Sequence, residues 1–160
     1  MKINKGILTV ISALAGAAAG AGIVSKKSEE KLSIQKAYTD KHLSLYLMMN
    51  QWVKIKQENK SIADYLAENG YREIAVYGMN YVGQTLLNEL AGSSVKVRYG
   101  IDKNASNIYS DIDIVLPEEK LERVDAVIVT PITFFDGIEE ALSKKLDCPI
   151  LSMEDILYEV

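Results

Sequence analysis

The sequence predicts an α/β fold: a small three-layer domain with a mostly parallel five-stranded sheet in the order 3-2-1-4-5, preceded by long N-terminal helices. Five short apolar runs alternate with helix-prone stretches after residue 73, which is the pattern of successive βα units. The first run ends in a glycine-containing turn that leads directly into a helical stretch. The expected strands are 74–77, 95–101, 111–116, 124–129 and 149–152, joined by right-handed crossovers. A helical turn is expected to open at 117–119, after the third strand.

The turn after the first strand is the most informative stretch of the chain. It reads I-A-V-Y-G-M-N-Y-V-G over residues 74–83. Gly78 would let the chain leave the strand at an angle that a Cβ disfavours, and Gly83 would let the next helix pack close to the strand. Amides at the start of that helix would favour a phosphate. The turn therefore indicates a Rossmann-like, NAD(P)-binding type of unit, although Asn80 stands where the middle glycine is usual.

Candidate cofactor-binding residues come from this turn and from two neighbouring strand ends. The turn contributes Gly78, Met79, Asn80, Tyr81 and Gly83. Asp102 follows the second strand, where nicotinamide-dinucleotide folds place an acid for a ribose hydroxyl, but it reads equally well as a turn aspartate. Thr130 and Thr133 follow the fourth strand and could donate hydroxyls to a phosphate or sugar, while the alternative for Thr133 is to cap the next helix.

Composition bounds the class of protein. The 160 residues are 48% hydrophobic and 25% charged, which allows one packed domain and an extension. A net charge of −4 argues against nucleic-acid binding. The chain has one cysteine, Cys148, and one histidine, His42, so an intrachain disulfide, a cysteine metal cluster and a multi-histidine metal site are excluded.

The N-terminal segment is expected to be a membrane anchor. Residues 7–24 carry no charge, lysines flank them on both sides, and eighteen residues are near the minimum that spans a bilayer. Gly16 and Gly20 form a small-xxx-small pattern, so the stretch resembles the glycine-zipper anchors of small bacterial membrane proteins. A signal peptide cleaved near 19–21, giving a secreted protein, and a buried helix are the alternatives. Lys26 and Lys27 favour a cytoplasmic sheet domain behind a single-pass anchor at 1–27.

A helical connector is expected over 28–60, between the anchor and the sheet domain at 61–160. It has neither glycine nor proline from 29 to 59. An apolar stripe runs along one face at three- and four-residue spacing, through Tyr38, His42, Leu45, Met49 and Trp52. This Tyr38–Trp52 stripe predicts a contact surface for the sheet domain, for a second copy in a homo-oligomer, or for a partner.

Several stretches of the sheet domain resemble one bacterial family. They read I-A-V-Y-G-M-N-Y-V-G, Y-G-I-D-K-N, D-A-V-I-V-T and D-C-P-I-L-S-M-E-D-I-L, within 61–160. They resemble the small Rossmann-like, sugar-nucleotide epimerase-like domain found with glycosyltransferases and other enzymes of capsule and cell-surface polysaccharide biosynthesis. The resemblance implies a nucleotide or nucleotide-sugar site at Gly78, Asn80, Gly83 and Asp102, and a glycosyltransferase or related enzyme as partner. The chain departs from the family by standing behind a membrane segment without a fused transferase.

The sequence offers no catalytic constellation. Tyr99 and Lys103 match the Tyr-x-x-x-Lys spacing of short-chain epimerases and dehydrogenases, but they fall on a strand end and turn, not a helix. There is no phosphate loop and no nucleophile elbow. The prediction is a membrane-tethered accessory module that binds NAD(P), another nucleotide or a nucleotide-sugar. The alternative is a non-catalytic scaffold with a degenerate Rossmann fold that self-associates or recruits a glycosyltransferase.

Overall fold

A computed structural model describes the backbone of residues 5–160 and the side chains of residues 29–160. The chain divides into two compact units, Met1–Leu45 and Tyr46–Val160. A single helix, α1 (Lys5–Gln57), runs through the first unit and provides the first element of the second. No helix among the described residues is both long and apolar enough to cross a bilayer. The expected anchor at 7–24 and the alternative cleavage site at 19–21 lie outside the residues whose side chains are described.

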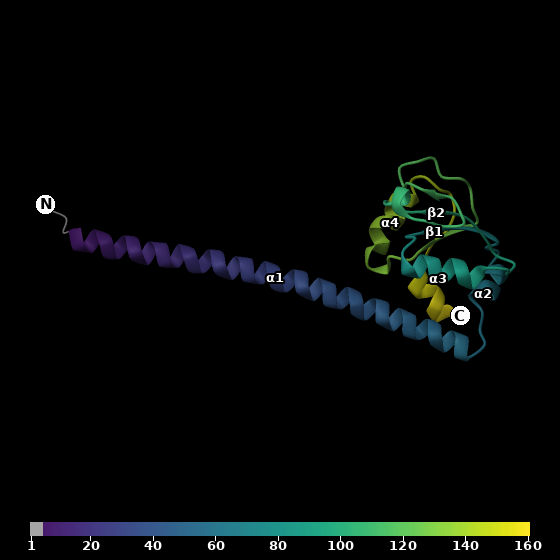
Figure 1. The fold of residues 1–160 in the computed structure, drawn as a ribbon, viewed down its shortest axis with the longest axis horizontal. Coiled ribbons are helices and arrows are strands. Elements are labelled where there is room, and N and C mark those ends of the chain that lie inside the picture. The colour runs from purple at the N-terminus through teal and green to yellow at the C-terminus, as the bar shows by residue number, and fades with distance from the viewer. Residues whose placement is uncertain (1–4) are drawn as a thin grey trace. The chain divides into compact units, whose positions relative to one another are not determined.

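The second unit holds a five-stranded, all-parallel sheet in the order β3-β2-β1-β4-β5, which confirms the predicted fold class and strand order (Figure 1). Its strands are β1 (Glu73–Tyr77), β2 (Lys96–Ile101), β3 (Ile114–Val115), β4 (Ala126–Val129) and β5 (Ile150–Ser152). The helices are α2 (Ile62–Glu68), α3 (Tyr81–Leu90), α4 (Phe135–Leu142) and α5 (Met153–Glu159), with single 3-10 turns η1 (Ala105–Asn107) and η2 (Ile132–Phe134).

One face of the sheet is covered by α4 and by an irregular crossover. Alternate residues of β1, β2 and β4 point to this face and pack with Leu142 of α4 and with Leu146. The ten residues 116–125 that connect β3 to β4 contain no helix, so the helical turn expected at 117–119 is wrong; only a hydrogen-bonded turn forms there. Leu121 and Val124 of this crossover cover the sheet in place of a helix, which is the reason that no amphipathic helix is needed.

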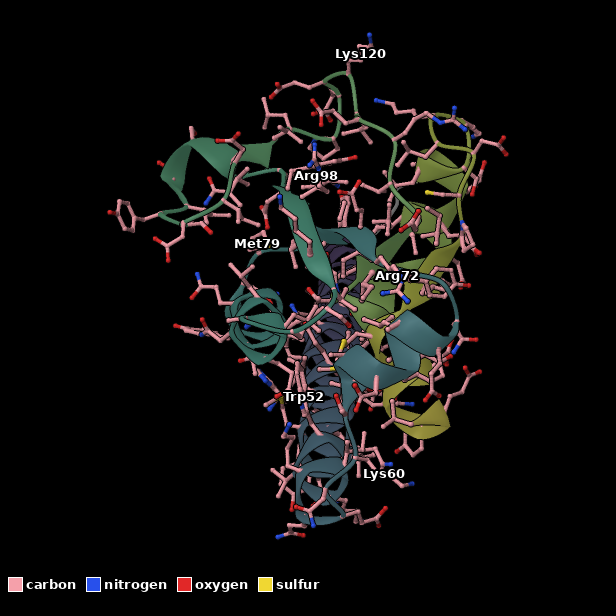
Figure 2. The ribbon with its side chains drawn as sticks, turned by 90° about the vertical axis from the view of Figure 1, so that its right-hand side faces the viewer. Trp52, Lys60, Arg72, Met79, Arg98 and Lys120 are labelled. Atoms are coloured by element: carbon pink, nitrogen blue, oxygen red, sulfur yellow. The ribbon has the colours of Figure 1, made fainter. Side chains whose placement is uncertain are left out.

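The opposite face is covered by α3 and α5, which Figure 1 shows on the same side of the strands. The last turns of α1 belong to this layer, because Met48, Trp52 and Ile55 are buried. Figure 2 shows Trp52 on this part of α1. Two side-chain bonds hold the segment: Gln51 Nε2 donates to the Leu157 carbonyl at 3.1 Å, and Lys56 Nζ pairs with Glu89 of α3 at 2.5 Å.

The buried face of α1 differs from the stripe that the sequence indicated. Of the Tyr38–Trp52 stripe, only Trp52 is buried. Leu45 is half-buried, whereas Tyr38, His42 and Met49 are exposed. The spacing of 48, 52 and 55 turns a different edge of the helix toward the domain. A second apolar face therefore remains exposed on α1.

Candidate functional site

The turn between β1 and α3 has the geometry that its glycines predict. Gly78 adopts φ +90°, and a Cβ there would stand 2.7 Å from Thr130 Oγ1 and from the Pro131 ring. A Cβ at Gly83 would stand 2.3 Å from the Gly78 carbonyl oxygen. Both positions therefore require glycine, the first for its left-handed backbone and the second because the helix approaches the strand end closely.

Two amides of this turn are already hydrogen-bonded to side chains of the protein. The Met79 amide donates to Asp102 Oδ2 at 2.8 Å. The Val82 amide donates to Asn80 Oδ1 at 3.0 Å, so Asn80 acts as the N-cap of α3. A carboxylate of the chain thus occupies part of the position where a Rossmann-type turn favours a phosphate, and the pyrophosphate pose of dinucleotide folds would bring like charges together here.

Met79 and Thr130 are committed to the interior. Met79 is 1% exposed, and its side chain fills the space that the absent Cβ of Gly100 leaves. Figure 2 shows Met79 between α3 and β2. Thr130 is fully buried, and its hydroxyl lies 2.6 Å from the Gly78 carbonyl oxygen and 3.2 Å from that of Tyr77. Its single proton is used within the turn and stabilises the left-handed conformation of Gly78.

Tyr81 and Thr133 are exposed. Tyr81 is the first residue of α3 and is 91% exposed. Thr133 lies within η2, and α4 begins at Phe135 with Phe134 as a cap residue that makes no side-chain capping bond. The alternative interpretation of Thr133 as a helix cap is therefore wrong, because α4 begins one residue further along the chain, with Phe134 and not Thr133 at the cap position. The Thr133 hydroxyl is left for other partners.

A cavity of about 1010 Å³ opens at the carboxyl edge of the sheet, between the ends of β1, β2 and β4 and the helix α4. This is the point where the strand order reverses between β1 and β4, and open α/β sheets bind ligands there. The rings of Pro131, Phe134 and Phe135 give it an apolar wall. Its charged lining residues are Asp102, Lys103, Glu118, Asp136 and Lys145.

The cavity brings together only part of the residue set that the sequence singled out. Gly78, Asn80, Asp102 and Thr133 line it. Met79, Tyr81, Gly83 and Thr130 do not, although Gly83 and Thr130 shape the turn behind it. The cavity lining also includes residues outside the predicted set: Tyr77, Lys103, Glu118 and the Phe134–Phe135 pair. Lys103 and Glu118 had a signal in the sequence, since each follows a predicted strand at its carboxyl end.

Asp102 is held rigidly at the cavity edge. Its two oxygens accept from the amides of Met79 and Asn104, at 2.8 and 2.9 Å, which joins the ends of β1 and β2. Asp102 therefore has the turn role that the sequence analysis gave as an alternative, and each of its carboxylate oxygens can accept a further hydrogen bond. Across the cavity, Lys145 Nζ donates to the Pro117 carbonyl at 2.6 Å and fixes the crossover against the end of α4.

Three of the side chains considered for chemistry or metal binding can be placed in the structure. No group of three histidine, cysteine, aspartate or glutamate residues among them could hold a metal ion. Tyr99 lies on β2, and its hydroxyl donates a hydrogen bond to the Glu122 carbonyl at 2.7 Å. The Tyr99 hydroxyl is therefore bonded to the crossover and not to Lys103, its partner in the Tyr-x-x-x-Lys spacing. Burial raises the pKa of the Cys148 thiol, which disfavours the reactive thiolate.

The fold and cavity define a small, doubly wound α/β protein with a ligand-sized crevice at its topological switch point. Comparison with known proteins finds no matching family model, no matching curated protein and no matching solved structure.

Proposed function

We propose that the chain is a nucleotide- or nucleotide-sugar-binding accessory module. The observation that carries this proposal is the cavity of about 1010 Å³ at the switch point, lined by an ordered carboxylate, an exposed lysine and aromatic rings. Small-molecule sites of α/β folds have this volume, position and lining: mostly apolar walls with a few polar groups that fix orientation.

Different residues of the cavity lining suit the base, the sugar and the phosphate of such a ligand. Phe134 and Phe135 offer apolar faces to a base. Asp102 presents free lone pairs to a ribose hydroxyl. Lys103 is exposed at the cavity edge and supplies a positive charge for a phosphate. The phosphate would lie toward this lysine, because Asp102 already occupies the Met79 amide of the turn.

The setting in cell-envelope polysaccharide biosynthesis is the second part of the proposal. It is supported by the resemblance of 61–160 to domains that accompany glycosyltransferases, and by the uncharged run at 7–24 with its small-residue spacing. In this setting the anchor holds the module at the cytoplasmic face of the membrane. It would there present its ligand to a membrane-associated transferase.

Calorimetric titration of the purified full chain with NAD(P), UDP-sugars and acyl-CoA tests the binding function. A Lys103→Ala variant should weaken binding of the phosphorylated ligand about tenfold, the value of one lost charge-assisted contact. Lys96→Ala is the matched control: Lys96 is an exposed lysine at the amino end of β2, the strand that precedes Lys103, and it lies outside the cavity. Absence of binding at millimolar ligand, or equal effects of the two substitutions, would remove the nucleotide function.

A scaffold role is the second candidate, and the exposed apolar residues of α1 favour it. Leu43 is 54% exposed, Tyr46 68% and Val53 52%, on a helix whose other face packs on the domain. Self-association or recruitment of a transferase would cover them. Sedimentation of the full chain in detergent, compared with a Leu43→Ser, Tyr46→Ser, Val53→Ser variant, tests this role. A mass of one chain in both proteins would argue against self-association.

A further inference from the structure

Tyr77 is a largely buried residue whose hydroxyl makes no hydrogen bond to another described residue. Tyr77 is the last residue of β1, is 7% exposed, and lines the cavity. No hydrogen bond joins its hydroxyl to any other residue within 29–160, whereas the comparable hydroxyl of Tyr99 is bonded to the Glu122 carbonyl. A hydroxyl that is open to a cavity can bind water there and can exchange that water for a polar group of a ligand. The oxygen retains contact with the cavity, since no fully enclosed unsatisfied side-chain atom occurs among the described residues.

Two of the three carboxylates that line the cavity act electrostatically on the Tyr77 hydroxyl. Asp102 and Glu118 both line the cavity with Tyr77, from the ends of β2 and β3. Burial, followed by the charges of Asp102 and Glu118, raises the pKa of Tyr77 above its ordinary value. The phenol therefore stays protonated at neutral pH and can donate a hydrogen bond, and the two carboxylates can only accept.

This combination selects the chemistry of the ligand group that it can hold. A sugar hydroxyl both donates and accepts, so it can satisfy a phenol and a carboxylate together. A phosphate only accepts, and two carboxylates beside it would repel its charge. The phosphate of the same ligand has Lys103 and Lys145 on the cavity lining for its counter-charge.

We infer that Tyr77, Asp102 and Glu118 form a subsite for the hydroxyl groups of a sugar ring, so that the module recognises the sugar of a nucleotide-sugar and not only its nucleotide. The inference rests on the proposed function for the rest of the ligand. Glu118 reaches the site from the helix-free crossover, which Lys145 holds in place through the Pro117 carbonyl.

The test compares UDP with UDP-glucose and UDP-N-acetylglucosamine on the full chain, by calorimetry. The wild type should bind the nucleotide-sugars about fivefold more tightly than UDP, and Tyr77→Phe should abolish that difference while leaving UDP affinity unchanged. Tyr99→Phe is the control, because the Tyr99 hydroxyl is bonded to the Glu122 carbonyl outside the cavity. This variant should still bind the nucleotide-sugars more tightly than UDP. Tyr77→Phe should also melt at or above the wild-type temperature, since the removed oxygen has no partner within the domain.

The other outcomes distinguish failure of the sugar subsite from failure of the proposed nucleotide function. Equal affinity of wild type for UDP and its sugars, or an equal loss of both in Tyr77→Phe, overturns the subsite and leaves the nucleotide function standing. If no nucleotide binds, the proposed function fails, and the subsite is tested with glucose and N-acetylglucosamine at tens of millimolar. A shift of the Tyr77 ring signals in NMR spectra, absent for the same sugars in a Glu118→Gln variant, then supports the subsite, and no shift overturns it.

Discussion

Gly83→Ala should destabilise the sheet domain although alanine is the better helix former. The added Cβ would stand 2.3 Å from the Gly78 carbonyl oxygen, well below the ~3.0 Å that such contacts tolerate. The neighbour is backbone and cannot rotate away, so helix and strand must separate. Replacing glycine in a helix by alanine gains about 0.5–1 kcal/mol, and overpacking costs roughly 1–3 kcal/mol. The expected net loss of unfolding free energy is about 1–2 kcal/mol.

The matched control is Gly137→Ala in α4, where no atom lies within 4 Å of the added Cβ. It should gain about 0.5 kcal/mol, because only the propensity term acts. Urea unfolding of the full chain, followed by the fluorescence of Trp52, measures both; Trp52 is the one tryptophan of the sequence and is 4% exposed. A Gly83→Ala protein as stable as wild type, or a Gly137→Ala protein that loses as much, would refute the close-approach argument.

Three further predictions concern the turns, α1 and a tyrosine. Gly78→Ala should lower the free energy of unfolding by at least about 2 kcal/mol, because the strain of a left-handed backbone at φ +90° adds to contacts at 2.7 Å. Gly92→Ala, at φ +74° in open space, should cost only about 1 kcal/mol in the same urea assay. Trp52→Ala should cost about 3–5 kcal/mol by thermal unfolding and Val53→Ala, 52% exposed, under about 0.5 kcal/mol; equal values would mean that α1 does not pack on the domain. Burial raises the pKa of Tyr99 from 10.0 to about 12. The protonated Tyr99 therefore contributes fully to the stability of the folded chain below pH 10, and this contribution is lost as the pH rises toward 12. Denaturant titrations at pH 9 and 11.5 should show a smaller decrease for Tyr99→Phe than for wild type.

The order of the sheet could be predicted because its signals are local. The apolar runs of β1 and β4, the alternation in β2 and the glycines of the first turn each act within a few residues. The positive φ of Gly78 and the close approach at Gly83 are the physical reasons that the turn was recognisable. The helix-free crossover was not predictable from propensity, because Pro117 followed by two glutamates is an ordinary helix start, and packing of Leu121 and Val124 decided otherwise.

The site was less predictable because it depends on which side chain faces which layer. Met79 was selected by its place in the turn, but its side chain packs in the core, in the space over Gly100. Thr130 was selected for its hydroxyl, but that hydroxyl donates its hydrogen bond to the Gly78 carbonyl. Tyr77 was overlooked because it reads as one more apolar residue of a strand. The pairing of β1 with β2 and β4 places its end at the switch point, where Tyr77 lines the cavity.

The helix-free crossover between β3 and β4 has a consequence for how specificity could change over evolution. Pro117 and Glu118 of this crossover line the crevice, and residues 116–125 contribute no helix to the three-layer frame. Substitutions at these two positions would alter the lining of the crevice, while Leu121 and Val124 further along the crossover continue to cover the sheet. The first residues of the crossover can thus change the shape and charge of the crevice without a change in the helices that cover the sheet.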